Sequence, residues 1–299
     1  MIFQRQRLMC GWTPRQKIKY YIKNECIEDE ANNLPQFVEK SEAAIHTVNG
    51  LVRTEAGIEK TIHTFPLSEN LREKTKHITQ EQVFKNTIEN TPYEFKMVEI
   101  DKLITSQGVV FLDFVEKLKQ SFPQNPSAEQ LFDICLTLTK EYAPISRLKA
   151  NENTYIYASD SADFRVIGVF PKPVKDYQLS SDLITGIPVR SVIVLLGYGL
   201  PVATAVEVDK KIFLINGFHR LYALAEMGVK EVPLLIHKIT DQFDLSPYKP
   251  YITEFLFNHP RPPLMKDFFN PDLTLEIKTI PRRKTIKVQV NHESFDVPL

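Results

Sequence analysis

The clearest pattern of apolar and polar positions lies between residues 212 and 236. The apolar run 212–215 is typical of a buried strand, and Asn216-Gly217 marks a turn. Apolar residues then recur at helical spacing through 218–227, and Gly228 is a typical helix end. A second apolar run follows at 232–236. This order predicts a strand, a helix and a second strand, and we expect the two strands to run parallel.

The first 95 residues predict helices. Thr13–Gln16 and Thr79–Gln82 each have the residue types of a capping box, in which a threonine and a glutamine satisfy the first amides of a helix. Between them, residues 34–71 are polar and threonine-rich without a strong period, so we expect short helices and loops there. Residues 1–95 are therefore expected to form a helical N-terminal extension.

Strands and helices alternate through the middle and the end of the chain. Apolar residues at helical spacing predict a helix over 111–122, and Ser127–Gln130 forms a third capping box before another. Residues 154–158 and 164–170 are rich in aromatic and β-branched side chains and predict strands. The alternating segments 273–277 and 286–290 predict a closing β-hairpin. Together these elements predict a mixed α/β fold class.

Composition narrows the class of protein. The chain has 299 residues, of which 43% are apolar and 25% charged, so it should form one or two folded domains. Its formal net charge is zero, which argues against a generally basic nucleic-acid binder. Residues 1–24 nevertheless carry basic residues and no acidic one, a pattern typical of either a nucleic-acid-binding arm or a solvated helix face.

Cysteine usage and hydropathy indicate the compartment. The chain has three scattered cysteines, Cys10, Cys26 and Cys135, which favour reduced thiols and a cytoplasmic location. The longest uncharged, mostly apolar stretch is 192–206, which is too short to span a bilayer as one helix. We therefore expect no membrane association.

The turn after the first apolar run has candidate chemistry. A glycine before a helix permits close approach of a ligand to the backbone, and the first helical N–H groups can hold an anion. His219 and Arg220 could add charge-assisted hydrogen bonds to a phosphate or carboxylate. The residue types at Asn216, Gly217, Phe218, His219 and Arg220 therefore predict an anion site. The alternative is an ordinary strand–helix–strand unit in which Asn216 caps the helix and Arg220 is solvated.

The same residues carry a resemblance to a known family. The sequence Asn216-Gly217-Phe218-His219-Arg220, followed by Ala223, Gly228 and the run Val232-Pro233-Leu234, resembles the central motif of the ParB/sulfiredoxin superfamily, specifically the ParB N-terminal-like domain. Residues 199–208 resemble the family's preceding strand. Residues 98–104 resemble its opening strand and turn, and Gln107 resembles the glutamine of its first box.

The resemblance implies an organisation of the chain. Residues 96–240 would form a ParB/sulfiredoxin-like domain with an insertion over 108–190, between the N-terminal extension and a C-terminal extension over 241–299. The insertion could supply a substrate lid, a partner surface or a thickening of the core.

The resemblance also implies a ligand. In that superfamily the turn typically cradles nucleotide phosphates, which suggests ATP or another nucleotide with Mg²⁺. His219 and Arg220 would then be the catalytic candidates, because Arg220 could neutralise charge during phosphoryl transfer and His219 could orient phosphate or act as an acid or base. The metal ligands are not identifiable from the sequence; Asp101 and Glu207 are candidates.

Departures from the family limit the function. Sulfiredoxins place a nucleophilic cysteine where this chain has Phe218, which argues against sulfinic-acid reduction. Partitioning ParB proteins carry two arginines where this chain has His219 and Arg220, and the later Glu-Asn-x-Gln-Arg box is missing, which argues against a CTP-dependent clamp.

Three alternatives stay open. The chain could bind a nucleotide or another phosphate ligand at the Gly217–Arg220 turn, with nucleotide hydrolysis or phosphoryl transfer. It could be a non-catalytic partner-binding or regulatory protein that retains the fold. It could also be a DNA-processing protein, such as a nuclease, which would need carboxylates gathered around a metal. The sequence does not decide whether the chain is an enzyme.

Overall fold

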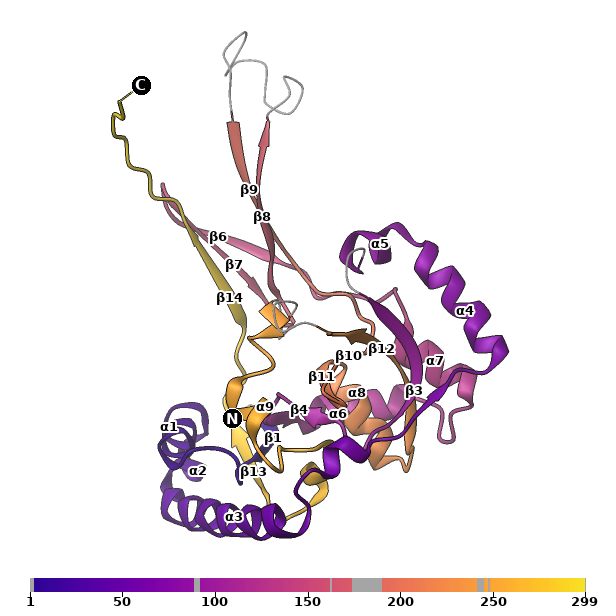
Figure 1. Cartoon of the computed structure of the whole chain (residues 1–299). Helices are drawn as coiled ribbons and strands as arrows, with labels where there is room; N and C mark the ends of the chain where they lie inside the picture. The colour runs from indigo at the N-terminus through magenta and orange to yellow at the C-terminus, as the bar shows by residue number, and fades with distance from the viewer. Residues whose placement is uncertain are drawn as a thin grey trace. The chain divides into compact units, whose positions relative to one another are not determined.

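The computed structural model describes residues 3–88, 92–161, 163–173, 190–240, 245–246 and 248–298 (Figure 1). These residues form helices and several sheets, which confirms the predicted mixed α/β fold class. The chain divides into two compact units. Unit 1 comprises residues 1–139 and 201–281, and unit 2 comprises residues 140–200 and 282–299. The predicted division at residues 95 and 240 does not coincide with these units.

A six-stranded sheet forms the centre of unit 1. Its strands are, in spatial order, β2 (Thr64–Pro66), β3 (Tyr93–Glu99), β12 (Glu231–Lys238), β10 (Thr204–Val208), β11 (Lys211–Asn216) and β4 (Ile104–Thr105). Strand β10 pairs antiparallel with β11 and parallel with β12. The two strands on either side of β10 therefore run in opposite directions, and the expectation that they are parallel was wrong. A buried apolar run indicates burial but carries no information about strand direction.

Helix α8 (Phe218–Glu226) connects β11 to β12, and it ends where the sequence predicts. Gly228 has a φ of 88°, which an L side chain rarely adopts. Its N–H donates to the Ala225 carbonyl at 2.9 Å, and the next amide, from Val229, donates to the Leu224 carbonyl at 3.0 Å. This pair of bonds is a Schellman motif, so the glycine closes the helix by satisfying its last carbonyls.

A second, antiparallel sheet joins the two ends of unit 1. It consists of β13 (Thr274–Thr279), β1 (Gln4–Met9) and β5 (Val109–Phe111). Leu8, Leu275 and Ile277 from this sheet form one buried cluster with residues of helices α1 (Arg15–Glu25) and α3 (Leu34–Thr54). The first residues of the chain are thus the central strand of a sheet, and they do not belong to a separate helical extension.

The remaining helices of unit 1 are all shorter than α3. They are α2 (Glu28–Asn32), α4 (Glu69–Gln80), α5 (Gln82–Ile88), α6 (Leu112–Ser121), α7 (Ala128–Leu136), α9 (Glu254–Asn258) and the 3₁₀ helices Ile58–Thr61 and Met265–Phe269. The capping box at Ser127 is confirmed. The box at Thr79 was wrong as a helix start, because α4 continues through Thr79 to Gln80. None of the described helices combines the length and apolar character needed to cross a bilayer.

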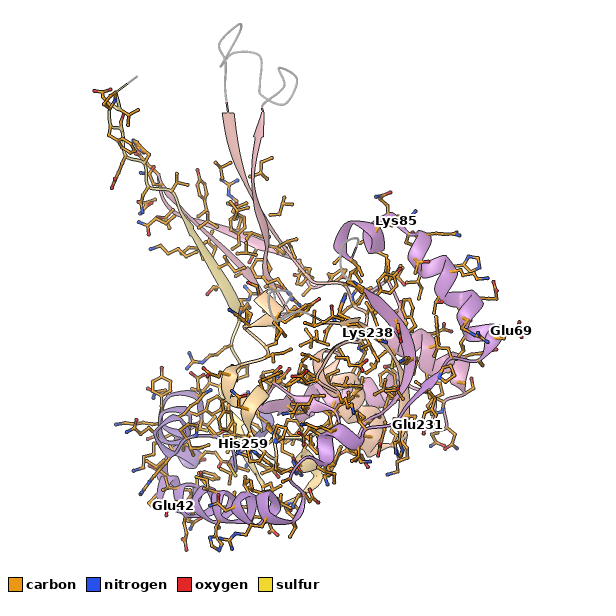
Figure 2. All side chains as sticks on the ribbon, in the orientation of Figure 1. Glu42, Glu69, Lys85, Glu231, Lys238 and His259 are labelled. Atoms are coloured by element: carbon orange, nitrogen blue, oxygen red, sulfur yellow. The ribbon has the colours of Figure 1, made fainter. Side chains whose placement is uncertain are left out.

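The basic residues near the N-terminus lie on folded elements. Arg5 forms an ion pair with Asp113 at 2.8 Å, Arg7 with Glu276, and Arg15 with Glu42 at 2.8 Å. Glu42, labelled in Figure 2, lies on α3, so its ion pair with Arg15 links α3 to α1. Three lysines, Lys17, Lys19 and Lys23, lie exposed on α1. These placements match a solvated helix face better than a free nucleic-acid-binding arm.

Unit 2 consists of a sheet and a long two-stranded ribbon. The sheet has the order β14 (Lys284–Gln289), β7 (Thr154–Ser159) and β6 (Ser146–Asn151), and the ribbon pairs β8 (Arg165–Pro173) antiparallel with β9 (Arg190–Gly197). At the end of β9, the Tyr198 ring stacks on Tyr142 with centroids 4.7 Å apart.

The predicted C-terminal hairpin was wrong. Strand β13 pairs with β1 in unit 1, whereas β14 pairs with β7 in unit 2. Both segments are strands, as predicted, but each finds a partner far away in the sequence. The predicted insertion 108–190 also differs from unit 2, because β5, α6 and α7 belong to unit 1.

Candidate functional site

The predicted turn lies between β11 and α8, and its glycine has a structural reason. Gly217 has a φ of 101°, and a Cβ at this position would lie 2.9 Å from the Cβ of Ala203. The backbone of Gly217 is therefore approached closely by Ala203, in the segment just before β10. The Asn216 side chain fastens the same segment, because its Nδ2 donates to the Val202 carbonyl at 2.9 Å. The N-cap residue of α8 is Gly217 and not Asn216.

Phe218 and the helix behind it face the core. Phe218, Leu221 and Leu224 are all buried, as the helical spacing of apolar residues predicts. The phenylalanine that follows Gly217 is thus part of the packed interior. The backbone amides at this helix end lie at the positive end of the helix dipole.

His219 is directed towards β5 and α6. Its Nε2 accepts a hydrogen bond from the Phe111 N–H at 3.1 Å. The ring stacks on Phe111 with centroids 5.4 Å apart and meets Phe114 edge-on at 5.3 Å. A nitrogen that accepts from an amide carries no proton, so in this arrangement the ring proton is on Nδ1. For His219 to act as a base through Nε2, it would have to release the Phe111 amide.

Arg220 is directed towards the end of α7. Its Nη1 donates to the Ile134 carbonyl at 2.9 Å and lies 3.4 Å from the Cys135 carbonyl. The Ala203 amide also donates to the Cys135 carbonyl, at 2.7 Å. A cation at this position stabilises the negative end of the α7 dipole and satisfies carbonyls that have no partner within the helix.

Cys135, beside Arg220, is not set up as a nucleophile. Burial raises the pKa of its thiol to about 12, although the Arg220 charge acts in the opposite direction. Burial also raises the pKa of Cys10 to about 11 and that of Cys26 to about 12. All three thiols are buried and stay protonated near neutral pH, whereas reactive cysteines are thiolates.

The turn therefore brings the five predicted residues together, but the side chains of His219 and Arg220 diverge. His219 contacts β5 and Arg220 contacts the end of α7. Sequence reasoning missed Ala203, Phe111 and Ile134, the residues that these side chains and the glycine contact. No local signal could have identified them, because Phe111 and Ile134 lie 108 and 86 positions away from their partners.

The structure does not add a metal site. Glu207 lies opposite Ile212 on β11, four residues from Asn216, which is about 13 Å along a strand. The Asp101 carbonyl accepts from the Lys266 amide. Within the described ranges, no group of three or more His, Cys, Asp and Glu side chains is arranged to hold a metal ion. Both candidates from the sequence therefore stay predictions without structural support.

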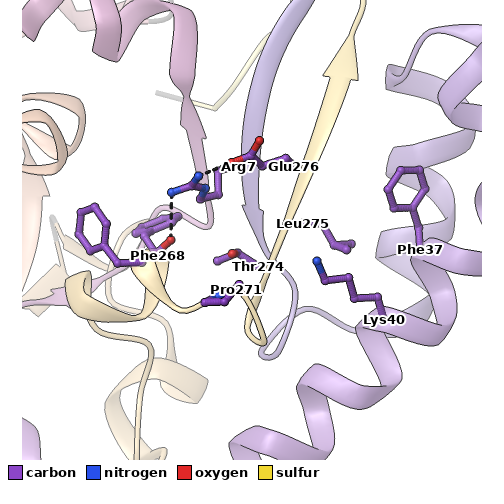
Figure 3. Close-up of a pocket in the computed structure, with 9 residues that line it drawn as sticks. Arg7, Phe37, Lys40, Phe268, Pro271, Thr274, Leu275 and Glu276 are labelled. Carbon is purple, nitrogen blue, oxygen red and sulfur yellow. Dashed lines mark hydrogen bonds and ion pairs between the residues drawn. The ribbon is translucent and has the colours of Figure 1, made fainter. Parts of the chain in front are cut away.

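A hollow on unit 1 is lined by residues of β1, α3, β13 and the 3₁₀ helix Met265–Phe269 (Figure 3). It has a volume of about 380 Å³, and its lining includes Arg7, Lys40, Phe268 and Glu276. Arg7 bonds to Glu276 and to the hydroxyl of Tyr222 on α8. Burial raises the pKa of that hydroxyl to about 12. Arg7 also donates to the Phe268 carbonyl at 3.5 Å, so it has three partners within the protein. The other cation that lines the hollow is Lys40.

No protein-family model, curated protein or solved structure matches the chain. The ParB/sulfiredoxin likeness consequently stays a prediction from the residues of the turn and its flanking strands.

Proposed function

We propose that this chain is a non-catalytic partner-binding protein that docks its partner on the β8–β9 ribbon of unit 2. The observation that carries the proposal is the exposure of apolar side chains along this ribbon. Val192 is 72% exposed and Val169 57%, and Val166, Ile167 and Leu195 are exposed as well. Contiguous exposed apolar surface of this kind is typical of interaction sites.

The composition of the ribbon supports the proposal. Residues 166–170 of β8 and 192–197 of β9 contain no charged or polar side chain. A strand with one face in water normally alternates apolar and polar residues. Val192 and Leu195 lie three positions apart on β9, where the pairing is regular, so their side chains point to opposite faces. Both are exposed, so apolar side chains reach solvent on both faces of the ribbon.

Unit 2 also has little interior of its own. Among its described residues, the buried apolar side chains are Ala158 and Phe164, whereas unit 1 contains extensive buried clusters. An isolated two-stranded ribbon is marginally stable in water. A partner that covers the ribbon would supply the missing buried surface.

Site-specific photo-cross-linking in the native host tests this proposal. A photo-reactive amino acid at Val192 should capture a discrete protein partner. The same residue at Val290, which is 53% exposed elsewhere in unit 2, should not. The added substitution Leu195→Lys should weaken capture from position 192, because a lysine in the interface must be desolvated. Equal capture from positions 192 and 290, or none from 192, would contradict the proposal.

A second proposal is the phosphate site at the Gly217–Arg220 turn. The observation in its favour is that α8, a helix of nine residues, begins at this turn, with the half-buried His219 and Arg220 in its first turn. Its first amides and the guanidinium could hold a nucleotide phosphate if Arg220 exchanged the α7 carbonyls for the ligand. Mg²⁺ would accompany a nucleotide, and its protein ligand is not assigned.

Calorimetric titration with ATP, ADP and CTP in the presence of Mg²⁺ tests the second proposal. Wild type should bind one of them, and Arg220→Ala should weaken that binding at least tenfold, or about 1.4 kcal/mol. Because Arg220 also bonds to α7, the variant should lose about 1–3 kcal/mol of stability whether or not a ligand binds. Thermal unfolding of each sample is therefore the control. A folded wild type that binds none of the three nucleotides would exclude this site.

A further inference from the structure

We infer that the partner on the ribbon is a second copy of this chain, paired antiparallel along the open edge of β9. The inference rests on the proposed docking function and identifies the partner. Within the described residues, the ribbon contains β8 and β9 alone, so each strand has one edge without a neighbouring strand. Such an edge is a template for pairing with another chain.

The two edges of the ribbon are not equivalent. β8 contains Pro171 and Pro173, and proline has no N–H to donate. Prolines two positions apart direct their nitrogens to the same edge, and proline in a sheet is found at open edges. β9 contains no proline over its eight residues, Arg190–Gly197. β9 therefore offers an uninterrupted ladder about 26 Å long, whereas β8 does not.

Pairing through β9 gives a closed assembly. Two antiparallel copies of one strand are related by a two-fold axis, so each copy presents the same surface to the other. The spatial order becomes β8, β9, the second β9 and the second β8, with a proline-containing strand at each outer edge. These prolines oppose further strand addition, so the assembly stops at a dimer. A sheet needs about three strands to be stable by itself. The two-stranded ribbon falls short of this number, and the four-stranded dimer exceeds it.

The charges along β9 are compatible with self-pairing. Residues 192–197 are uncharged, so no like charges meet in the centre of the paired strands. Arg190 is the charged residue of β9, and an antiparallel pair places its two copies at opposite ends. A charged or amphipathic partner would instead leave its polar groups facing an apolar ribbon, which has no hydrogen-bonding side chains to offer over this stretch.

Sedimentation of the purified full chain is the primary test. Wild type should sediment as a dimer at micromolar concentrations, and Val192→Lys/Leu195→Lys should sediment as a monomer. Val290→Lys, the matched change outside the ribbon, should stay dimeric. A wild type that is monomeric at every concentration tested would overturn the inference, and so would a dimer that the double variant leaves intact.

Cysteine substitution provides a second test that does not depend on destabilising the ribbon. The native thiols are buried, with their pKa values raised to about 11 or 12, so an introduced thiol should be oxidised first. Single cysteines at 192, 193, 194 and 195 should give disulfide-linked dimers with a sharp maximum at one position. Only a residue beside the two-fold axis lies within disulfide distance of its own copy. Equal cross-linking at all four positions would overturn the antiparallel pairing.

These outcomes separate the inference from the proposal on which it rests. A monomeric purified chain whose position 192 captures a different protein in the native host overturns self-pairing and leaves docking on the ribbon supported. Capture of the chain itself from position 192, together with a dimer in solution, supports both.

Discussion

Asp267→Ala is expected to lower the free energy of unfolding by about 3–5 kcal/mol, the range found when one partner of a buried ion pair is removed. Arg261 is fully buried, and its Nη1 and Nη2 donate to the two Asp267 carboxylate oxygens, each at 2.7 Å. Asp267 also accepts the Leu264 amide at 2.7 Å. The substitution would therefore leave a buried guanidinium and a buried amide without this carboxylate.

The surroundings of Arg261 increase the expected effect. Its Nε donates to Glu55 at 2.9 Å, and the Trp12 indole donates to the Arg261 carbonyl at 3.1 Å. Partial burial alone would raise the pKa of Glu55, but hydrogen bonds from Lys266 and Arg261 lower it. Glu55 is therefore a carboxylate at neutral pH, yet it is partly exposed and cannot replace the bidentate contact of Asp267.

Urea unfolding followed by fluorescence measures this effect. Trp12 is the single tryptophan of the chain, and it reports directly on the segment that Arg261 holds. The control is Asp133→Ala, which removes an exposed pair with Lys74 in the same unit and should change stability by less than about 1 kcal/mol. If Asp267→Ala changed stability no more than this control, the Arg261–Asp267 pair would not be buried as the structure has it.

Local sequence patterns predicted where helices and strands form, but they did not predict which strands pair with one another. The strand, turn and helix around Gly217 follow from residues within one or two turns of each other, so periodicity and turn chemistry were enough to place them. The directions of β11 and β12 depend on β10 lying between them, which no local pattern records. The segments around 275 and 287 were recognised as strands because alternation shows which face is buried, but alternation does not identify the neighbouring strand.

Helix α3 was missed for a different reason. It is the longest helix described, yet residues 34–71 were expected to form short helices and loops. Its buried positions are Val38, Ser41, Ala44 and Val48, spaced as a helix requires. Two of these four are small, and Ser41 is polar, so hydropathy alone gives a weak signal. Small residues suit this face, because α3 packs closely against α1.

At the candidate site, too, the sequence did not record the tertiary contacts of the side chains. Residue types at the turn indicated an anion site because a glycine and two basic side chains are what such sites use. The structure gives each of them a partner within the fold: Ala203 for Gly217, the Phe111 amide for His219 and the Ile134 carbonyl for Arg220. A basic residue in sequence therefore has two possible uses, and only the tertiary contacts show which one the folded chain has adopted.

Acidification from pH 7 to pH 4 is expected to lower the free energy of unfolding by about 3 kcal/mol through His237 alone. His237 lies on β12, is 7% exposed, and its Nδ1 has no hydrogen-bond partner within the described part of the chain. Burial lowers its pKa from 6.5 to about 4. Because the folded-state pKa is depressed, the unfolded chain takes up a proton first, and the stability present above pH 6.5 is lost as the pH falls towards 4.

Comparison with His237→Phe isolates this contribution. Phenylalanine cannot take up a proton and keeps an aromatic ring beside Tyr248, whose centroid lies 5.7 Å from that of His237. Urea unfolding at pH 7, 5.5 and 4 should therefore show a smaller loss of stability for His237→Phe than for wild type, by about 3 kcal/mol at pH 4. The matched control is His46→Phe at an exposed position on α3, which should follow wild type. Carboxylates such as Glu55 contribute equally to all three proteins, so the difference between them belongs to His237. Parallel curves for wild type and His237→Phe would mean that this imidazole is hydrated and charges freely in the folded chain.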